Sequence, residues 1–99
     1  MEALPGVTAR WVGGHTAGLQ IVSVPTARGR VVLTSDASHF CRNIERREPV
    51  QIITHLPQML QGFDWIDALA GSSPLVVVGH DPEVARRFDE VEPGIIKIP

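Results

Sequence analysis

The chain has 99 residues, enough for one small domain with a modest core, and its 43% hydrophobic and 20% charged residues are typical of a folded, soluble protein. Nine basic and eleven acidic side chains give a net charge of −2 without long runs of one sign, which argues against a nucleic-acid or anionic-membrane partner. The sequence has no apolar run near the roughly 20 residues of a membrane span, no signal-peptide pattern and a single cysteine, Cys41, so we expect a cytoplasmic protein without an internal disulfide.

The first third of the chain predicts three short strands. The strands are expected over 8–14, which ends at Gly13–Gly14, over 18–24, which alternates between apolar and polar positions and is rich in β-branched residues, and over 30–36. Pro25 and Gly29 indicate a hairpin-like turn between the last two strands. A short helix is expected over 37–46, with Ser38 as its N-cap.

The middle of the chain predicts a loop followed by the clearest helix. The segment 48–57 lies between two prolines and is expected to be a loop. The segment 57–71 predicts a helix, because Pro57 stands in the first turn and Gly71 at the C-terminal end. Its apolar stripe, at three- and four-residue spacing, consists of Met59, Leu60, Phe63, Ile66, Leu69 and Ala70.

The last quarter of the chain predicts a strand, a helix and a strand. The apolar run 74–79 is typical of a strand that is covered on both faces. Asp81 is a candidate N-cap and Pro82 a candidate first residue for a helix over 81–90, and 94–98 is a candidate terminal strand. The element order indicates an α/β or α+β fold.

Three residues that can bind metal follow the predicted strands. His15 comes after the first strand, Asp36 after the third, and His80 after the apolar run. Strand ends can gather at one edge of a sheet, so these side chains can converge although they are far apart in sequence. Two imidazoles and a carboxylate suit a catalytic zinc, which uses about three protein ligands and leaves a position for water. Non-haem iron uses the same ligand types, so the residues alone do not select the metal.

Glycines flank the two histidines. Gly14, Gly18 and Gly79 remove side chains beside them and permit backbone conformations that other residues resist, which would let a metal and a substrate come close. Thr16 is a candidate for orienting a ligand by a hydrogen bond.

Each candidate also has an ordinary structural explanation. A lone histidine beside glycine is usually a turn or cap residue, and Asp36 by itself would cap the following helix. Asp81 has its own capping explanation whatever His80 does. The occurrence of three ligand types at three strand ends favours the metal site.

The segments "GGHTAGLQ", "SDASHF" and "GHDPEV" resemble the metallo-β-lactamase superfamily of metal-dependent hydrolases. Within it, the chain looks like the N-acyl homoserine lactonase branch, which includes pyridoxolactonase-like enzymes. The resemblance spans His15 to about Phe88, and the motifs occur in the family order. Thioester-cleaving relatives more typically have Gly-Asp-Thr at the aspartate, so "SDAS" favours the lactonase branch.

The resemblance implies a four-layer αββα sandwich with two metal ions, usually zinc. His15 would bind the first metal, His80 the second, and Asp36 would bridge them. Metal-activated water would then open the ring of a small-molecule lactone. Many lactonases have a substrate-contacting tyrosine where this chain has His39. That histidine either donates a hydrogen bond in the same way or is a surface residue without a role.

The family's upstream His-x-His-x-Asp-His run, which supplies four further ligands, does not occur in this sequence, and the remaining histidine, His55, stands alone. Residues 1–99 are therefore expected to form a single partial domain, the C-terminal half of the sandwich, with weak metal binding by itself. Half a sandwich leaves an apolar sheet face exposed, which predicts marginal stability and either homodimerisation or complementation by an N-terminal half.

The sequence thus favours the C-terminal portion of a zinc-dependent lactonase that opens N-acyl homoserine lactones or a similar lactone, inactive as a lone chain. The alternatives are a truncated non-catalytic remnant or small interaction domain, or another hydrolase of the same fold, such as a thioesterase. No nucleophile elbow, phosphate-binding loop or dinucleotide fingerprint points to other chemistry.

Overall fold

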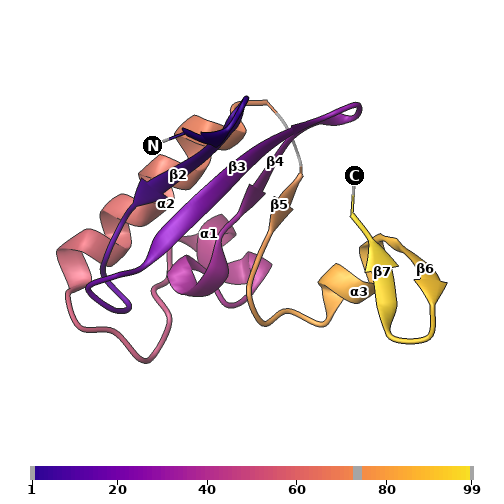
Figure 1. Cartoon of the computed structure of the whole chain (residues 1–99). Helices are drawn as coiled ribbons and strands as arrows, with labels where there is room; N and C mark the ends of the chain where they lie inside the picture. Colours follow the sequence, from indigo (N-terminus) through magenta and orange to yellow (C-terminus); the bar gives the residue numbers. More distant parts are fainter. Residues whose placement is uncertain (1, 73–74, 99) are drawn as a thin grey trace.

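The chain folds around one five-stranded sheet with helices on a single face (Figure 1). The computed structural model describes residues 2–72 and 75–98. Neighbouring strands in the sheet follow the order β1-β2-β3-β4-β5. The strands are β1 (Glu2–Leu4), β2 (Val7–Trp11), β3 (Gln20–Thr26), β4 (Gly29–Leu33) and β5 (Val76–Val77).

Strand direction determines what lies at each edge of this sheet. The pairs β1–β2, β2–β3 and β3–β4 are antiparallel, whereas β5 runs parallel to β4. It follows that β2, β4 and β5 point the same way. The loops that leave these three strands therefore emerge at one common edge.

Two helices cover one face of the sheet and a smaller unit follows at the C-terminus (Figure 1). A 3₁₀ turn, Ser35–Ala37, precedes α1 (Cys41–Arg46), and α2 (Leu56–Ala70) is the longest helix. The chain ends with α3 (Glu83–Arg87) and a hairpin of β6 (Asp89–Glu92) and β7 (Ile95–Lys97). None of the helices in the described part of the chain has the length and apolarity to cross a membrane.

The core lies between α2 and the sheet. Ile21 of β3 and Val32 of β4 are fully buried, and they pack in one cluster with Phe63 and Ile66 of α2. The register pairs Ser23 with Val32, so alternate residues of both strands point toward the helices. Burying side chains of this size stabilises the fold by about 1.5–3 kcal/mol each.

The opposite face of the sheet carries no helix (Figure 1). Val22 pairs with Leu33 and Leu33 with Val77, which places these three half-buried side chains on that face. Trp11 on β2 shares the face and is 55% exposed. Val31, which pairs with Val24 on the same face, is only 2% exposed. The face is therefore apolar as expected, but among these side chains only that of Trp11 is largely exposed.

Most sequence-predicted elements are present, and two helix starts are shifted. The short helix begins at Cys41 rather than at residue 37, and the residue before it is Phe40, so Ser38 is not its N-cap. Ser38 instead donates its hydroxyl hydrogen bond to the Phe40 carbonyl. In the third helix Pro82 precedes the first turn instead of occupying it.

The C-terminal predictions need larger corrections. The helix expected over 81–90 ends at Arg87, and β6 begins at Asp89, because this segment pairs with β7. The apolar run yields only the two-residue edge strand β5, and its Pro74 lies outside the described residues. Leu75 and Val78, which flank this strand, are each only 5% exposed, whereas Val76 and Val77 are half-buried. Leu60 of the α2 stripe is 39% exposed and does not belong to the core.

Gly14 is required where the chain leaves β2. Its φ of +89° lies in the left-handed region, and a Cβ there would be 2.7 Å from the Met59 backbone nitrogen of α2. The Gly14 carbonyl accepts hydrogen bonds from the backbone N–H groups of Thr54 and His55, just before α2 begins. Gly18 differs, because no atom lies within 4 Å of a Cβ built on it, and the structure gives it no role in close approach.

Replacing Gly14 by alanine should lower the free energy of unfolding by about 1–3 kcal/mol, because alanine strains the backbone and meets α2. Gly18→Ala is the matched control and should change stability by less than about 1 kcal/mol. Urea unfolding followed by tryptophan fluorescence measures both. Equal stability of the two variants would contradict the close packing of Gly14 on α2.

Candidate metal centre

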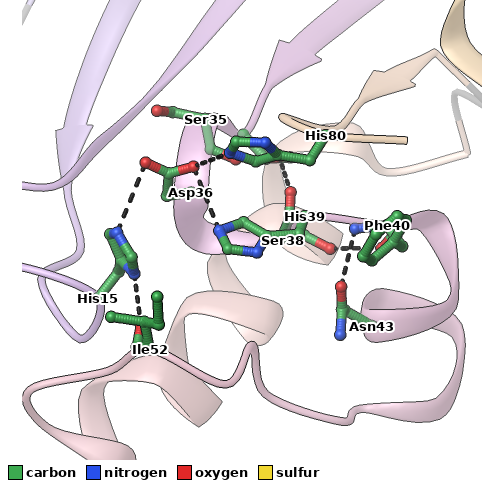
Figure 2. Close-up of polar contacts among 10 residues, drawn as sticks. His15, Ser35, Asp36, Ser38, His39, Phe40, Asn43, Ile52 and His80 are labelled. Atoms are coloured by element: carbon green, nitrogen blue, oxygen red, sulfur yellow. Dashed lines mark hydrogen bonds and ion pairs between the residues drawn. The ribbon is translucent and has the colours of Figure 1, made fainter. Parts of the chain in front are cut away.

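The three ligand candidates predicted from the sequence lie together at one edge of the sheet, and a third histidine, His39, joins them (Figure 2). His15 follows β2, Asp36 follows β4 and His80 follows β5, the three strands that share one direction. The sheet topology therefore brings the cluster together, as the strand-end pattern predicted.

The position of His15 is fixed by the loop that precedes α2. Its Nδ1 donates a hydrogen bond to the Ile52 carbonyl oxygen at 2.5 Å. The proton on Nδ1 leaves a lone pair on Nε2, the atom that faces Asp36. A backbone carbonyl that orients a histidine in this way is typical of metal ligands.

Asp36 stands on the 3₁₀ turn directly after β4. The preceding residue, Ser35, has a φ of 49°, a left-handed conformation that turns the chain sharply at the strand end. The β5 loop packs closely on this turn, since a Cβ on Gly79 would lie 2.7 Å from the Ser35 carbonyl oxygen. Glycine at position 79 therefore allows the two strand-end loops to touch, whereas the sequence predicted that it makes room for a metal and a substrate.

Backbone hydrogen bonds join the two loops that carry Asp36, His39 and His80. The Gly79 N–H donates to the Ser38 carbonyl at 2.9 Å, and the His80 N–H donates to the His39 carbonyl at 2.8 Å. The two imidazoles consequently lie side by side, with ring centroids 4.3 Å apart.

The Asp36 carboxylate is the common partner of all three imidazoles (Figure 2). His80 Nε2 donates to Oδ1 at 2.8 Å, and His39 Nε2 lies 3.3 Å from the same oxygen. His15 Nε2 approaches the other oxygen, Oδ2, at 3.6 Å. The side chains of His15 and His39 are 16% and 21% exposed, whereas that of His80 is 57% exposed.

The electrostatics of the cluster favour an ionised carboxylate and a neutral His39. Partial burial raises the pKa of Asp36, but the His80 hydrogen bond and the charges of the three histidines outweigh it and lower the pKa below its usual value. Burial is the main cause that lowers the pKa of His39, and the charge of His80 lowers it further. These are the protonation states in which both residues bind a metal.

A metal ion fits the residues present. Ligand atoms of His15, Asp36 and His39 lie within 4.8 Å of one another, close enough to share one ion. Within the described residues, His39 Nε2 is buried without a hydrogen-bond partner. The nitrogen and oxygen donors are those that zinc and iron accept. The geometry leaves the choice between these metals open.

Asp81, next to His80, links α3 to α1. Its Oδ2 accepts from the Cys41 N–H at 2.9 Å and its Oδ1 from the Glu83 N–H at 2.9 Å. The two backbone hydrogen bonds lower the pKa of Asp81. The N-cap of α3 is Pro82 and not Asp81 as predicted, but the Asp81 carboxylate accepts hydrogen bonds at the starts of both helices. The bond to Cys41 has no local sequence signal.

Two features of the site differ from what the sequence predicted. The group that orients His15 is the Ile52 carbonyl and not Thr16, whose side chain makes no hydrogen bond within the described part of the chain. Every residue has a backbone carbonyl, so no sequence pattern could have predicted this contact. His39 was expected beside the substrate, and its inward position in the cluster was detectable only as a three-residue spacing from Asp36.

Comparison with known proteins gives a consistent family relationship. No protein-family model matches the chain. An N-acyl homoserine lactonase of a Bacillus species is 33% identical over 96 residues, covering 86% of this chain. The chain spans only 34% of that relative's length.

Solved structures agree with the sequence relationship. An N-acyl homoserine lactone hydrolase with its product N-hexanoyl-L-homoserine bound at a catalytic metal centre matches with a TM-score of 0.79 and 28% identity, over 94% of this chain and 37% of that one. The B. thuringiensis lactonase AiiA, with N-decanoyl-L-homoserine bound, gives a TM-score of 0.80 over the same shares, also at 28% identity. A probable metal-dependent hydrolase from Staphylococcus aureus shares the fold, with a TM-score of 0.62, 16% identity and coverage of 82% and 30%.

The sheet with its helical layer and its edge cluster of histidines and aspartate places the chain in the metallo-β-lactamase fold class. Within that class it is related to the N-acyl homoserine lactonases and corresponds to about a third of their length.

The hydrogen bonds predict opposite tautomers for two histidines at neutral pH. His15 should carry its proton on Nδ1, because that atom donates to Ile52. His55 should carry it on Nε2, because its Nδ1 accepts from the Gln58 N–H at the start of α2. Long-range ¹H–¹⁵N spectra of the metal-free chain distinguish the two forms. An Nε2–H tautomer at His15 would show that the Ile52 carbonyl does not orient this side chain.

Proposed function

We propose that this chain supplies part of the metal centre of a hydrolase that opens the ring of an N-acyl homoserine lactone or a similar lactone. The observation that carries the proposal is the approach of two histidines to different oxygens of one carboxylate: His15 lies 3.6 Å from Oδ2 and His80 lies 2.8 Å from Oδ1 of Asp36. Asp36 is thus within reach of both imidazoles, and this arrangement supports His15 and His80 as ligands of separate ions that would share this carboxylate. The related lactonases support the substrate class.

The residues have distinct roles in this proposal. His15 would hold the first ion and His80 the second, Asp36 would be shared by both, and zinc is the proposed metal. Zinc, when bound, polarises the lactone carbonyl as a Lewis acid and makes water a better nucleophile at neutral pH. The Ile52 carbonyl holds His15 in the orientation needed for ligation. His39 was predicted to contact the substrate, and it remains a candidate residue at the reacting group.

The remaining ligands have to come from other polypeptide. The 99 residues include four histidines, none of them in a His-x-His-x-Asp-His run, and three of the four are already in the cluster. We propose that residues 1–99 form one partial domain whose uncovered apolar sheet face receives the second sheet of the αββα sandwich. Covering the half-exposed Trp11 and its neighbours would then complete both the core and the site.

The first test combines metal binding and complementation. The chain alone should bind zinc weakly and hydrolyse no N-hexanoyl homoserine lactone. Mixing it with the part of the Bacillus lactonase that it does not match should produce hydrolysis. Asp36→Asn should then lower the hydrolysis rate by more than about 100-fold, because the bridging ligand is lost. Equilibrium dialysis and a pH-stat assay give the two readouts.

His55→Asn serves as the control. His55 caps α2 through its Nδ1, and asparagine is also a good N-cap, so the variant should stay folded and keep full activity in the mixture. A mixture that stays inactive while far-ultraviolet circular dichroism shows folded chains would favour the non-catalytic remnant. Faster cleavage of a thioester than of the lactone would favour a thioesterase.

A further inference from the structure

The imidazole of His39 is the least satisfied polar group in the cluster. Its Nε2 is buried and, within the described residues, has no hydrogen-bond partner of acceptable geometry, although Asp36 Oδ1 lies only 3.3 Å away. Leaving a buried polar atom without a partner destabilises the fold. Such a cost is expected where an atom is placed for a ligand that the protein chain itself does not contain.

The direction of the His39 ring is set by the backbone. Asp36 belongs to the 3₁₀ turn and His39 follows two residues after its end, with the His39 carbonyl held by the His80 N–H. The ring is packed between His15 and His80, at centroid distances of 5.7 Å and 4.3 Å. His39 therefore points into the cluster and not outward to solvent, as Figure 2 shows.

The position of Nε2 also matches the other donors. Ligand atoms of His15, Asp36 and His39 form a group within 4.8 Å, a set that does not include His80. The three side chains are also the less exposed ones, at 16%, 34% and 21% against 57% for His80. An ion bound among these three side chains would therefore be less accessible to water than one bound at His80.

We propose that His39 Nε2 is itself a metal ligand, which together with His15 Nε2 and Asp36 gives this chain a three-ligand site of its own. The inference rests on the proposed function for the presence of a metal, and it adds a ligand at the position predicted to contact the substrate. Ligation uses the Nε2 lone pair, so this atom then has no proton to donate to a substrate. His39 would set the affinity and geometry of the ion rather than recognise the lactone.

Cadmium binding to the full chain tests the ligand set directly. ¹¹³Cd²⁺ is a spectroscopic probe for zinc sites, and a ligating imidazole shows scalar coupling between its ring protons and the metal. The ¹H–¹¹³Cd correlation spectrum should contain cross-peaks to the rings of both His15 and His39. A purely structural role of His39 would produce no such coupling.

Titration of variants with Co²⁺ gives the second readout. His39→Asn should weaken Co²⁺ binding by at least about tenfold and change the visible absorption spectrum, because one ligand is removed. His55→Asn introduces the same residue at a histidine outside the cluster and should bind Co²⁺ as the unmodified chain does. Circular dichroism of both variants checks that they remain folded.

The outcomes separate the two proposals. Failure of the unmodified chain to bind Cd²⁺ or Co²⁺ would overturn this inference, whereas the proposed function would still be decided by the complementation assay. Cross-peaks to His15 and His80 without one to His39, or equal Co²⁺ affinity of His39→Asn and the unmodified chain, would overturn the inference and leave the proposed ligands intact. Cross-peaks to His39 that disappear in His39→Asn would support it.

Discussion

The common direction of β2, β4 and β5 is the constraint on which the rest of the site depends. Because β3 runs antiparallel to both of its neighbours and β5 runs parallel to β4, all three ligand-bearing loops leave the sheet at one edge. His15 and His80 are 65 positions apart in sequence, yet both reach the same carboxylate. If any of these strands ran in the opposite direction, its ligand would lie at the opposite end of the strands, far from the other two.

The loops at this edge are held by backbone contacts more than by side chains. Gly14 rests against the start of α2, and Gly79 rests against the turn that carries Asp36. The carbonyls of Ser38 and His39 accept hydrogen bonds from the β5 loop. Such bonds fix the backbone of the loops that carry the donors.

The two faces of the sheet have different roles. One face is closed by α2 and contains the core around Ile21 and Phe63. The other bears the half-buried Val22 and Leu33, the buried Val31 and the exposed Trp11, and no helix of the described residues covers it. A domain with one covered face buries less apolar surface than a complete sandwich of the related lactonases would, so its stability is expected to depend on what covers the second face.

The sequence by itself determined the strand and helix types, the α2 helix with Pro57 and its terminal Gly71, and the three ligand candidates, because these depend on local periodicity and on the residues that end each strand. The predictions from the sequence were wrong for the start of α1, for the segment that forms β6 and for the burial of Leu60. Strand pairing and burial depend on neighbours that are distant in the chain. Only the tertiary structure decided that the Ile52 carbonyl orients His15 and that His39 turns inward beside Asp36. The physical reason is that both contacts depend on how loops from different strands pack against each other. Residue type does not specify which backbone carbonyl a side chain meets or how a loop is oriented.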